Sequence, residues 1–209
     1  MFAGHFGVAA GAKAIDVALL KKGKMDGIAS ASSQYRNVPL WALMLSTQLL
    51  DVVFVLLVIP GVEAFGGASG YGQGWIRAYY SHSLTGALLI SIVAGAFAWR
   101  WWGRQGGLLI GATVFSHWLL DLLVHRPDLP LLPGNIGSFP LLGFGLWNTP
   151  AISITLEALL ILSGAAFYIS SLFARTAQQP GGGRRALVTG GVMSVLLVLA
   201  LVSSVLGIG

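Results

Sequence analysis

The chain has 209 residues, of which 56% are hydrophobic and only 9% are charged, and its mean hydropathy is +0.80. Soluble domains carry about 25% charged residues, so this composition excludes a soluble globular protein and indicates a polytopic membrane protein. The net charge of +5 is spread over short basic clusters between apolar runs, which excludes a nucleic-acid-binding surface and fits membrane topology. Since the chain has no cysteine, any metal site would depend on His, Asp and Glu.

In chain order, the first segment is less apolar than those that follow it. Residues 1–20 contain Lys13 and Asp16, which their three-residue spacing would pair on one helix face. This segment is a sixth span, a re-entrant segment or an interfacial helix. Five later stretches reach the length of about 20 apolar residues that a bilayer requires. They are 40–60, 78–99, 106–125, 151–173 and 186–208. We therefore predict an all-α fold, a membrane helical bundle of five or six spans.

The connecting segments are rich in glycine and proline and suggest a division of the chain. Residues 61–74 are glycine-rich, and 126–150 contain five of the eight prolines. The sequence QQPGGGRR at 178–185 predicts a flexible hinge. We expect residues 1–175 to form a helical membrane domain that carries the functional site. Residues 176–209 would add a flexible loop and a terminal transmembrane helix.

The distribution of lysine and arginine predicts the orientation, because these residues concentrate on the cytoplasmic side of membrane spans. The connections on one side hold Lys21, Lys22, Lys24, Arg36, Arg100, Arg104, Arg175, Arg184 and Arg185. The alternate loops, 61–77 and 126–150, hold only Arg77 and Arg126. These two loops are therefore expected to face outward.

An unusual set of titratable residues lies in FSHWLLDLLVHRPDLP, residues 115–130. His117, Asp121 and His125 follow one another at four-residue intervals, which places them on one face of a helix. Two donors one turn apart can chelate a single ion. Imidazole and carboxylate ligands together suit zinc, manganese or iron.

Other ionisable residues are expected at the same depth, and such groups inside spans tend to be paired and functional. At about 1.5 Å of rise per residue, all of them fall in the outer half of the membrane. His5 joins them if residues 1–20 cross with the N-terminus outside. The further members are Asp51, His82 and Glu157.

Each of these residues also has a structural interpretation. A single histidine on an apolar helix is usually a hydrogen-bonded core residue, and His125 at the interface could simply be solvated. Arg126, in HRPD, could clamp an anionic group or extend toward the interface as a structural residue. Trp147 and Asn148 could line the mouth of a site or form part of an interfacial belt. The convergence of five or six groups at one depth favours a shared site.

Several short motifs resemble the family of membrane-bound, metal-dependent hydrolases of bacteria and archaea. They are GHF near the N-terminus, LLD ending at Asp51, YSHS around His82, SHWLLD, HRPDLP, and LWN before the helix with Glu157. The resemblance covers residues 1–170. It implies an enzyme of the prokaryotic inner membrane.

A weaker resemblance is to zinc-dependent phospholipase C and the related single-strand nucleases. Their ligand order is matched here by His5, Asp51, His82 and then His117 and Asp121. The later His and His-x3-Glu of that group have no full match, which favours one or two metal ions over three.

The expected function is a membrane-embedded metal-dependent hydrolase that acts on an ester or phosphoester, with a lipid reached laterally as a candidate substrate. The cofactor would be one or two divalent transition-metal ions, zinc being the first choice; such an ion acidifies water and polarises the scissile ester. Candidate general bases are Asp51, Asp121 and Glu157, and Arg126 is the candidate clamp. The expected metal ligands are His5, Asp51, His82, His117, Asp121 and His125.

Two other functions stay open. A proton-coupled or metal-coupled transporter would use the same His and Asp residues, since intramembrane titratable groups are what such proteins need. A membrane scaffold would use the metal only to hold its helices, and would unfold on chelation without any turnover.

Overall fold

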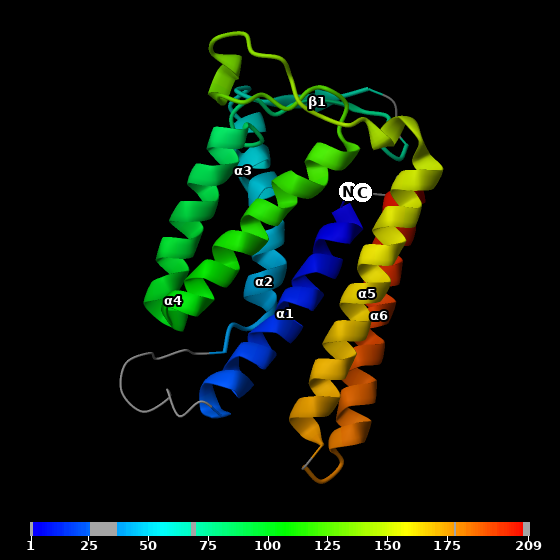
Figure 1. Ribbon diagram of the computed structural model, residues 1–209. Coiled ribbons are helices and arrows are strands. Elements are labelled where there is room, and N and C mark those ends of the chain that lie inside the picture. The colour runs from blue at the N-terminus through cyan, green and yellow to red at the C-terminus, as the bar shows by residue number, and fades with distance from the viewer. Residues whose placement is uncertain (1, 26–36, 68–69, 178, 207–209) are drawn as a thin grey trace.

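Six helices account for most of the chain in the computed structural model, which describes residues 2–25, 37–67, 70–177 and 179–206 (Figure 1). The helices are α1 (Phe2–Met25), α2 (Leu40–Thr47), α3 (Leu49–Val58), α4 (Leu84–Val124), α5 (Pro150–Thr176) and α6 (Gly182–Leu206). Two short strands, β1 (Ala64–Gly66) and β2 (Trp75–Arg77), pair antiparallel above one end of the helices. The single-turn helices η2 (Pro133–Asn135) and η3 (Leu146–Asn148) lie in the segment between α4 and α5. The predicted all-α bundle is confirmed.

The predicted span 40–60 is broken in the middle. Helices α2 and α3 meet at Gln48, where φ is −105° and ψ is 4°, and their axes are bent by 50°. At the break the Gln48 N–H donates to the Leu45 carbonyl, which closes a tighter turn than the α-helix has. The Thr47 carbonyl is then available to a partner from another helix, and it accepts a hydrogen bond from the His117 ring.

Helix α4 contains two of the predicted spans. Its 41 residues fold back on themselves at Gly103, whose φ of 69° is a conformation that favours glycine, so the two arms run antiparallel (Figure 1). The first arm begins at Leu84, where Ser83 is the N-cap and its hydroxyl accepts a hydrogen bond from the Gly86 N–H. The prediction that this span begins at residue 78 and includes His82 is therefore wrong. His82 lies in the turn that precedes the helix.

The helices have the length and the apolar character to cross a membrane. Helices α1, α4, α5 and α6 meet these requirements individually, and the bent pair α2–α3 meets them as one span. Residues 1–20, for which the sequence left three alternatives, thus belong to a helix long enough to span. The protein is a multi-pass membrane protein.

Packing between α1 and α5 depends on glycine. A Cβ atom on Gly164 would lie 2.1 Å from the Gly7 carbonyl oxygen, so no side chain fits where these two backbones meet. The core beside this contact also receives Leu197 of α6, which packs with Ala3 and Ile161. The terminal helix therefore belongs to the same bundle as α1 and α5.

The two ends of the bundle differ in character. The end of α1, the Gly103 turn and the connection from α5 to α6 lie together at the bottom of Figure 1. Basic residues occur in or beside these segments, namely Lys21, Arg100, Arg104, Arg175, Arg184 and Arg185. At the other end the segments 59–67, 70–83 and 125–149 cover the helices.

Candidate metal centre

Four histidine rings and two carboxylates meet near the covered end of the bundle. His5 comes from the first turns of α1, and Asp51 from α3. His82 immediately precedes the N-cap of α4, and His125 is the C-cap of the same helix. The second arm of α4 supplies His117 and Asp121. All of these side chains are buried except that of Asp51.

Asp121 lies at the middle of this group. Its Oδ1 is 3.3 Å from Nε2 of His5. Its Oδ2 is 3.0 Å from Nε2 of His117 and 3.5 Å from Nε2 of His82. Nε2 of His125 is farther from the same oxygen, at 3.8 Å. One buried carboxylate therefore faces the Nε2 atoms of all four histidines of the chain.

Asp51 approaches two of the same rings from α3. Its Oδ1 is 3.4 Å from Nε2 of His82 and 3.5 Å from Nε2 of His117, and these two nitrogens are 3.4 Å apart. Two triads of potential ligands result, Asp51–His82–His117 and His5–His117–Asp121. Both triads contain His117. Because Nε2 of this ring has one lone pair and can bind one ion, the two triads describe overlapping positions for a single ion.

Contacts on the far side of the rings determine which nitrogen carries the proton. Nδ1 of His117 is 2.6 Å from the Thr47 carbonyl oxygen. Nδ1 of His125 is 2.9 Å from Oδ1 of Asp128. Both partners only accept hydrogen bonds, so Nδ1 donates in each ring. In the neutral form, Nε2 of each ring then presents a lone pair to the centre.

In this neutral form the lone pairs of His117 and His125 face the carboxylate oxygens of the centre. A cation between such groups would be attracted to both. An ion about 2.0–2.1 Å from four tetrahedral ligands keeps those ligands roughly 3.3 Å apart. Five separations among His82, His117, Asp51 and Asp121 lie between 3.0 and 3.5 Å. Five of the six separations among these four residues therefore match those of a tetrahedral site, and three of the residues, Asp51, His82 and His117, form a group that could hold one ion.

The remaining two histidines lie at the edge of this four-residue set. The ring of His5 stacks on that of His117 with centroids 3.8 Å apart, and among the described residues Nδ1 of His5 has no hydrogen-bond partner. The ring of His125 packs against Trp147, with centroids 4.2 Å apart. The structure thus brings together all six predicted ligands, with His5 and His125 outside the tetrahedral arrangement.

Glu157 is close to the centre but is engaged elsewhere. Its Oε1 accepts a hydrogen bond from the Gly4 N–H and its Oε2 from the Tyr71 hydroxyl, each at 3.0 Å. Burial and the nearby Glu157 carboxylate raise the pKa of Tyr71 above its ordinary value, so the phenol stays a donor. These contacts hold the first turn of α1, and with it His5. The role of Glu157 as a general base stays a prediction.

Replacing Tyr71 with phenylalanine is expected to lower the free energy of unfolding by about 1–3 kcal/mol, because the buried Glu157 carboxylate loses a donor. Thermal unfolding in detergent measures the change. Tyr79→Phe is the matched control, since its hydroxyl has no partner in the part of the chain that the structure describes. An equal effect of both changes would contradict the role of the Tyr71–Glu157 contact.

Arg126 connects the two segments that cover the centre. Its guanidinium donates to the carbonyl oxygens of Gly72 at 2.7 Å and Gly74 at 3.2 Å, and to Oδ1 of Asn148 at 3.3 Å. These contacts anchor the loop between α3 and α4. The role of Arg126 as a clamp on an anionic group stays a prediction.

The predicted pair of Lys13 and Asp16 is confirmed, far along α1 from the centre. Its charged atoms are 2.6 Å apart, and Lys13 also donates to Asn37 and to the Val38 carbonyl. Oδ1 of Asp16 accepts from the Val38 N–H at 3.3 Å. The pair attaches the start of α2 to α1 and is structural.

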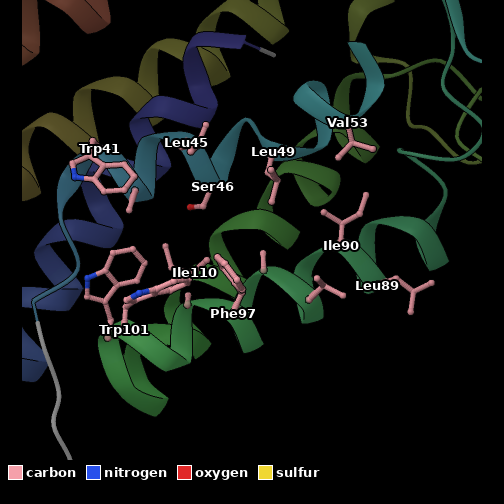
Figure 2. A pocket seen from close by; sticks show the side chains of 15 residues that line it. Trp41, Leu45, Ser46, Leu49, Val53, Leu89, Ile90, Phe97, Trp101 and Ile110 are labelled. Atoms are coloured by element: carbon pink, nitrogen blue, oxygen red, sulfur yellow. The ribbon is translucent and has the colours of Figure 1, made fainter. Parts of the chain in front are cut away.

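An apolar groove lies between α2–α3 and α4, away from the metal centre. It has a volume of about 990 Å³ and extends from Trp41 and Trp101 at one end to Val53 and Leu89 at the other (Figure 2). Leu49 and Val53 of α3 line it. Asp51 lies between these residues in the sequence and contacts the histidines instead. Groove and centre are therefore on different sides of α3.

Four residues that support the histidines escaped the sequence analysis. Asp128 could have been found, since it follows His125 by three residues in HRPD, and Ser81 directly precedes His82. No feature of the sequence indicates the role of Thr47, because its backbone carbonyl is available only through the break at Gln48. Glu63 lies in a connecting loop and is buried against Ser81.

Comparison with known proteins adds no assignment to this geometry. The roles of the residues around Asp121 therefore depend on the distances, burial and hydrogen bonds of the described residues. No protein-family model, curated protein or solved structure matches the chain.

Proposed function

We propose that the protein is a membrane-embedded metal-dependent hydrolase that cleaves an ester or phosphoester. The observation that carries the proposal is the convergence of His82, His117, Asp51 and Asp121, for which five of the six separations match those of a tetrahedral site. Nitrogen and oxygen ligands in this geometry favour zinc, without excluding manganese or iron. An ion held there supplies a Lewis acid for the ester oxygen and acidifies water.

Asp51 is the residue through which a substrate would reach the centre. Its side chain is 42% exposed, whereas those of His82, His117 and Asp121 are at most 4% exposed. Catalytic metal sites keep one position open to substrate, whereas structural sites are closed. An ion held by all four residues has no open position, so we propose that the exposed Asp51 is the ligand that water or substrate displaces. Once displaced from the ion, Asp51 is also our candidate for the group that accepts a proton.

The surroundings of Asp51 favour a lipid substrate. Its neighbours on α3, Val52 and Val55, are 40% and 53% exposed and face away from the core. In a membrane protein such side chains contact lipid, so Asp51 opens laterally toward the bilayer. We propose membrane lipids as the partners and a lipid ester or phosphoester as the substrate.

We propose that the site lies at the outer face of the membrane, and the distribution of charge supports this orientation. The basic residues beside the Gly103 turn and the α5–α6 connection lie at the end of the bundle opposite the centre. By the positive-inside rule that end is cytoplasmic. His5, His82 and Asp121 then lie nearer the outer face.

Purified protein in lipid nanodiscs is expected to hydrolyse one or more members of a panel of phosphodiester and carboxylic-ester lipids. A chelator should abolish turnover, and zinc should restore it. Asp51→Asn should reduce turnover strongly, while Asp16→Asn, which alters a buried aspartate far from the centre, should leave the reaction in place. Bound metal without turnover on any substrate would sink the hydrolase proposal in favour of the scaffold.

A transporter that uses the same residues is the second candidate. The cluster of titratable groups favours it, because ion-coupled carriers need such groups inside the membrane. Against the transporter, the ionisable pair nearer the other end of α1, Lys13 and Asp16, is engaged with Asn37 and Val38. This pair therefore gives no sign that a path of titratable groups continues across the membrane. Metal-driven or proton-driven flux in proteoliposomes, absent from His82→Ala, would establish the transporter.

A further inference from the structure

The buried carboxylate of Glu63 accepts three hydrogen bonds. Glu63 lies in the loop that follows α3 and is 1% exposed. Oε1 accepts from the backbone N–H groups of Tyr80 at 2.7 Å and Ser81 at 2.9 Å. Oε2 accepts from the Ser81 hydroxyl at 2.7 Å. The carboxylate thus determines where the hydroxyl hydrogen of Ser81 points.

The direction of that hydrogen affects the neighbouring histidine. Ser81 Oγ is also 2.8 Å from Nδ1 of His82. Because Ser81 gives its only hydrogen to Glu63, its oxygen can only accept from His82. The proton of the neutral His82 ring is therefore on Nδ1. Its Nε2 presents a lone pair toward Asp51, His117 and Asp121.

We propose that Glu63 is a positioning residue of the metal centre: through Ser81 it fixes His82 in the form protonated at Nδ1, with Nε2 free to bind metal. This inference rests on the metal centre of the proposed function and does not depend on the reaction. The His82 ring is also oriented by its backbone, since the Trp118 ring N–H donates to the His82 carbonyl at 2.9 Å. Backbone and side chain are thus both held.

Glu63→Gln is expected to reverse the two hydrogen bonds of the Ser81 hydroxyl without removing any. The two backbone N–H groups require an oxygen at the Oε1 position, so the glutamine amide nitrogen must face Ser81. Ser81 then accepts from glutamine and donates to Nδ1 of His82. The proton of the ring moves to Nε2, where it blocks the metal.

Two measurements follow from this reversal. In metal-free protein, at a pH at which the rings are neutral, nitrogen NMR should show His82 protonated at Nδ1 in the wild type and at Nε2 in Glu63→Gln. The four histidines of the chain make this spectrum assignable. Zinc affinity, from competition with a chromogenic chelator, should fall about 10–100-fold, the range for losing an outer contact of a ligand. The melting temperature should change little.

Ser81→Ala separates positioning from simple packing. This variant loses both hydrogen bonds of the Ser81 hydroxyl but places no hydrogen against Nδ1, so His82 can take either form. Zinc affinity should therefore fall less than in Glu63→Gln, although more contacts are lost. A purely structural role for Glu63 predicts the opposite order.

Glu157→Gln is the matched control, since Glu157 is equally buried and accepts hydrogen bonds from Gly4 and Tyr71. His82 should keep its proton on Nδ1 in this variant. An unchanged His82 spectrum and zinc affinity in Glu63→Gln would overturn the inference. If turnover is absent but the NMR result holds, the hydrolase proposal fails and the positioning role of Glu63 stands.

Discussion

Replacing His117 with alanine is expected to abolish metal binding and leave the bundle folded. His117 is 1% exposed, and its Nε2 lies 3.0 Å from Asp121, 3.4 Å from His82 and 3.5 Å from Asp51. Its loss removes one of four ligands and leaves the Thr47 carbonyl without the ring that it binds. The affinity should fall by more than the roughly 10–100-fold that outer contacts contribute.

The measurement is metal content by mass spectrometry on protein purified in detergent without chelators. Wild-type protein should carry a transition metal at close to one ion per chain, and His117→Ala should carry none. Val114→Ala is the control, because Val114 is fully buried on the same arm of α4 and has no atom that could bind a metal. It should retain the metal with reduced stability.

Two outcomes would contradict this prediction. Full metal content in His117→Ala would show that the ion is bound elsewhere. Absence of metal from both proteins would leave the His and Asp residues as a proton relay, and the transporter would become the leading function.

The replacement Asp121→Asn is expected to eliminate metal-dependent stabilisation while leaving the metal-free protein folded. Asp121 faces Nε2 atoms from all four histidines. An amide keeps the shape of this side chain but has no negative charge. It therefore lowers the affinity of the centre for a cation.

Thermal unfolding with and without zinc checks both parts. A ligand at 1,000 times its Kd stabilises a folded protein by about 4.1 kcal/mol, so the wild type should show a large zinc-dependent shift. Asp121→Asn should show none, and with chelator present it should still unfold cooperatively. Asp16→Asn, at the buried pair with Lys13, should melt lower and keep the zinc shift. If Asp121→Asn kept the zinc-dependent shift in melting temperature, the role of the Asp121 carboxylate as a metal ligand would be ruled out.

The spacing of His117, Asp121 and His125 could be interpreted correctly from the sequence because helical geometry is local. Four-residue intervals place side chains on one face whatever the helix packs against. The alternation of apolar spans and basic connections likewise depends on short stretches of chain. For this reason the all-α membrane fold, the two arms of α4 and the presence of His5 and Asp51 near the same end were predictable.

The position of His82 shows where local pattern is insufficient. The apolar run from residue 78 suggested a helix, but the Ser83 cap begins α4 at Leu84 and leaves His82 in a turn. The choice depends on competition between the helix and contacts from elsewhere, such as the Glu63 carboxylate on the Ser81 N–H. A sequence pattern within one segment contains no information about such a partner.

Composition and periodicity by themselves determined that this chain is a helical membrane protein with a band of His and Asp residues at one depth. Only the tertiary structure decided which atoms of those residues face one another. Glu157 and Arg126, predicted as chemical groups, bind backbone and loop atoms, while Thr47 and Glu63 orient the histidines. The physical reason is that hydrogen-bond partners are selected by the packing of distant segments, whereas helix formation and membrane partition are selected by neighbours along the chain.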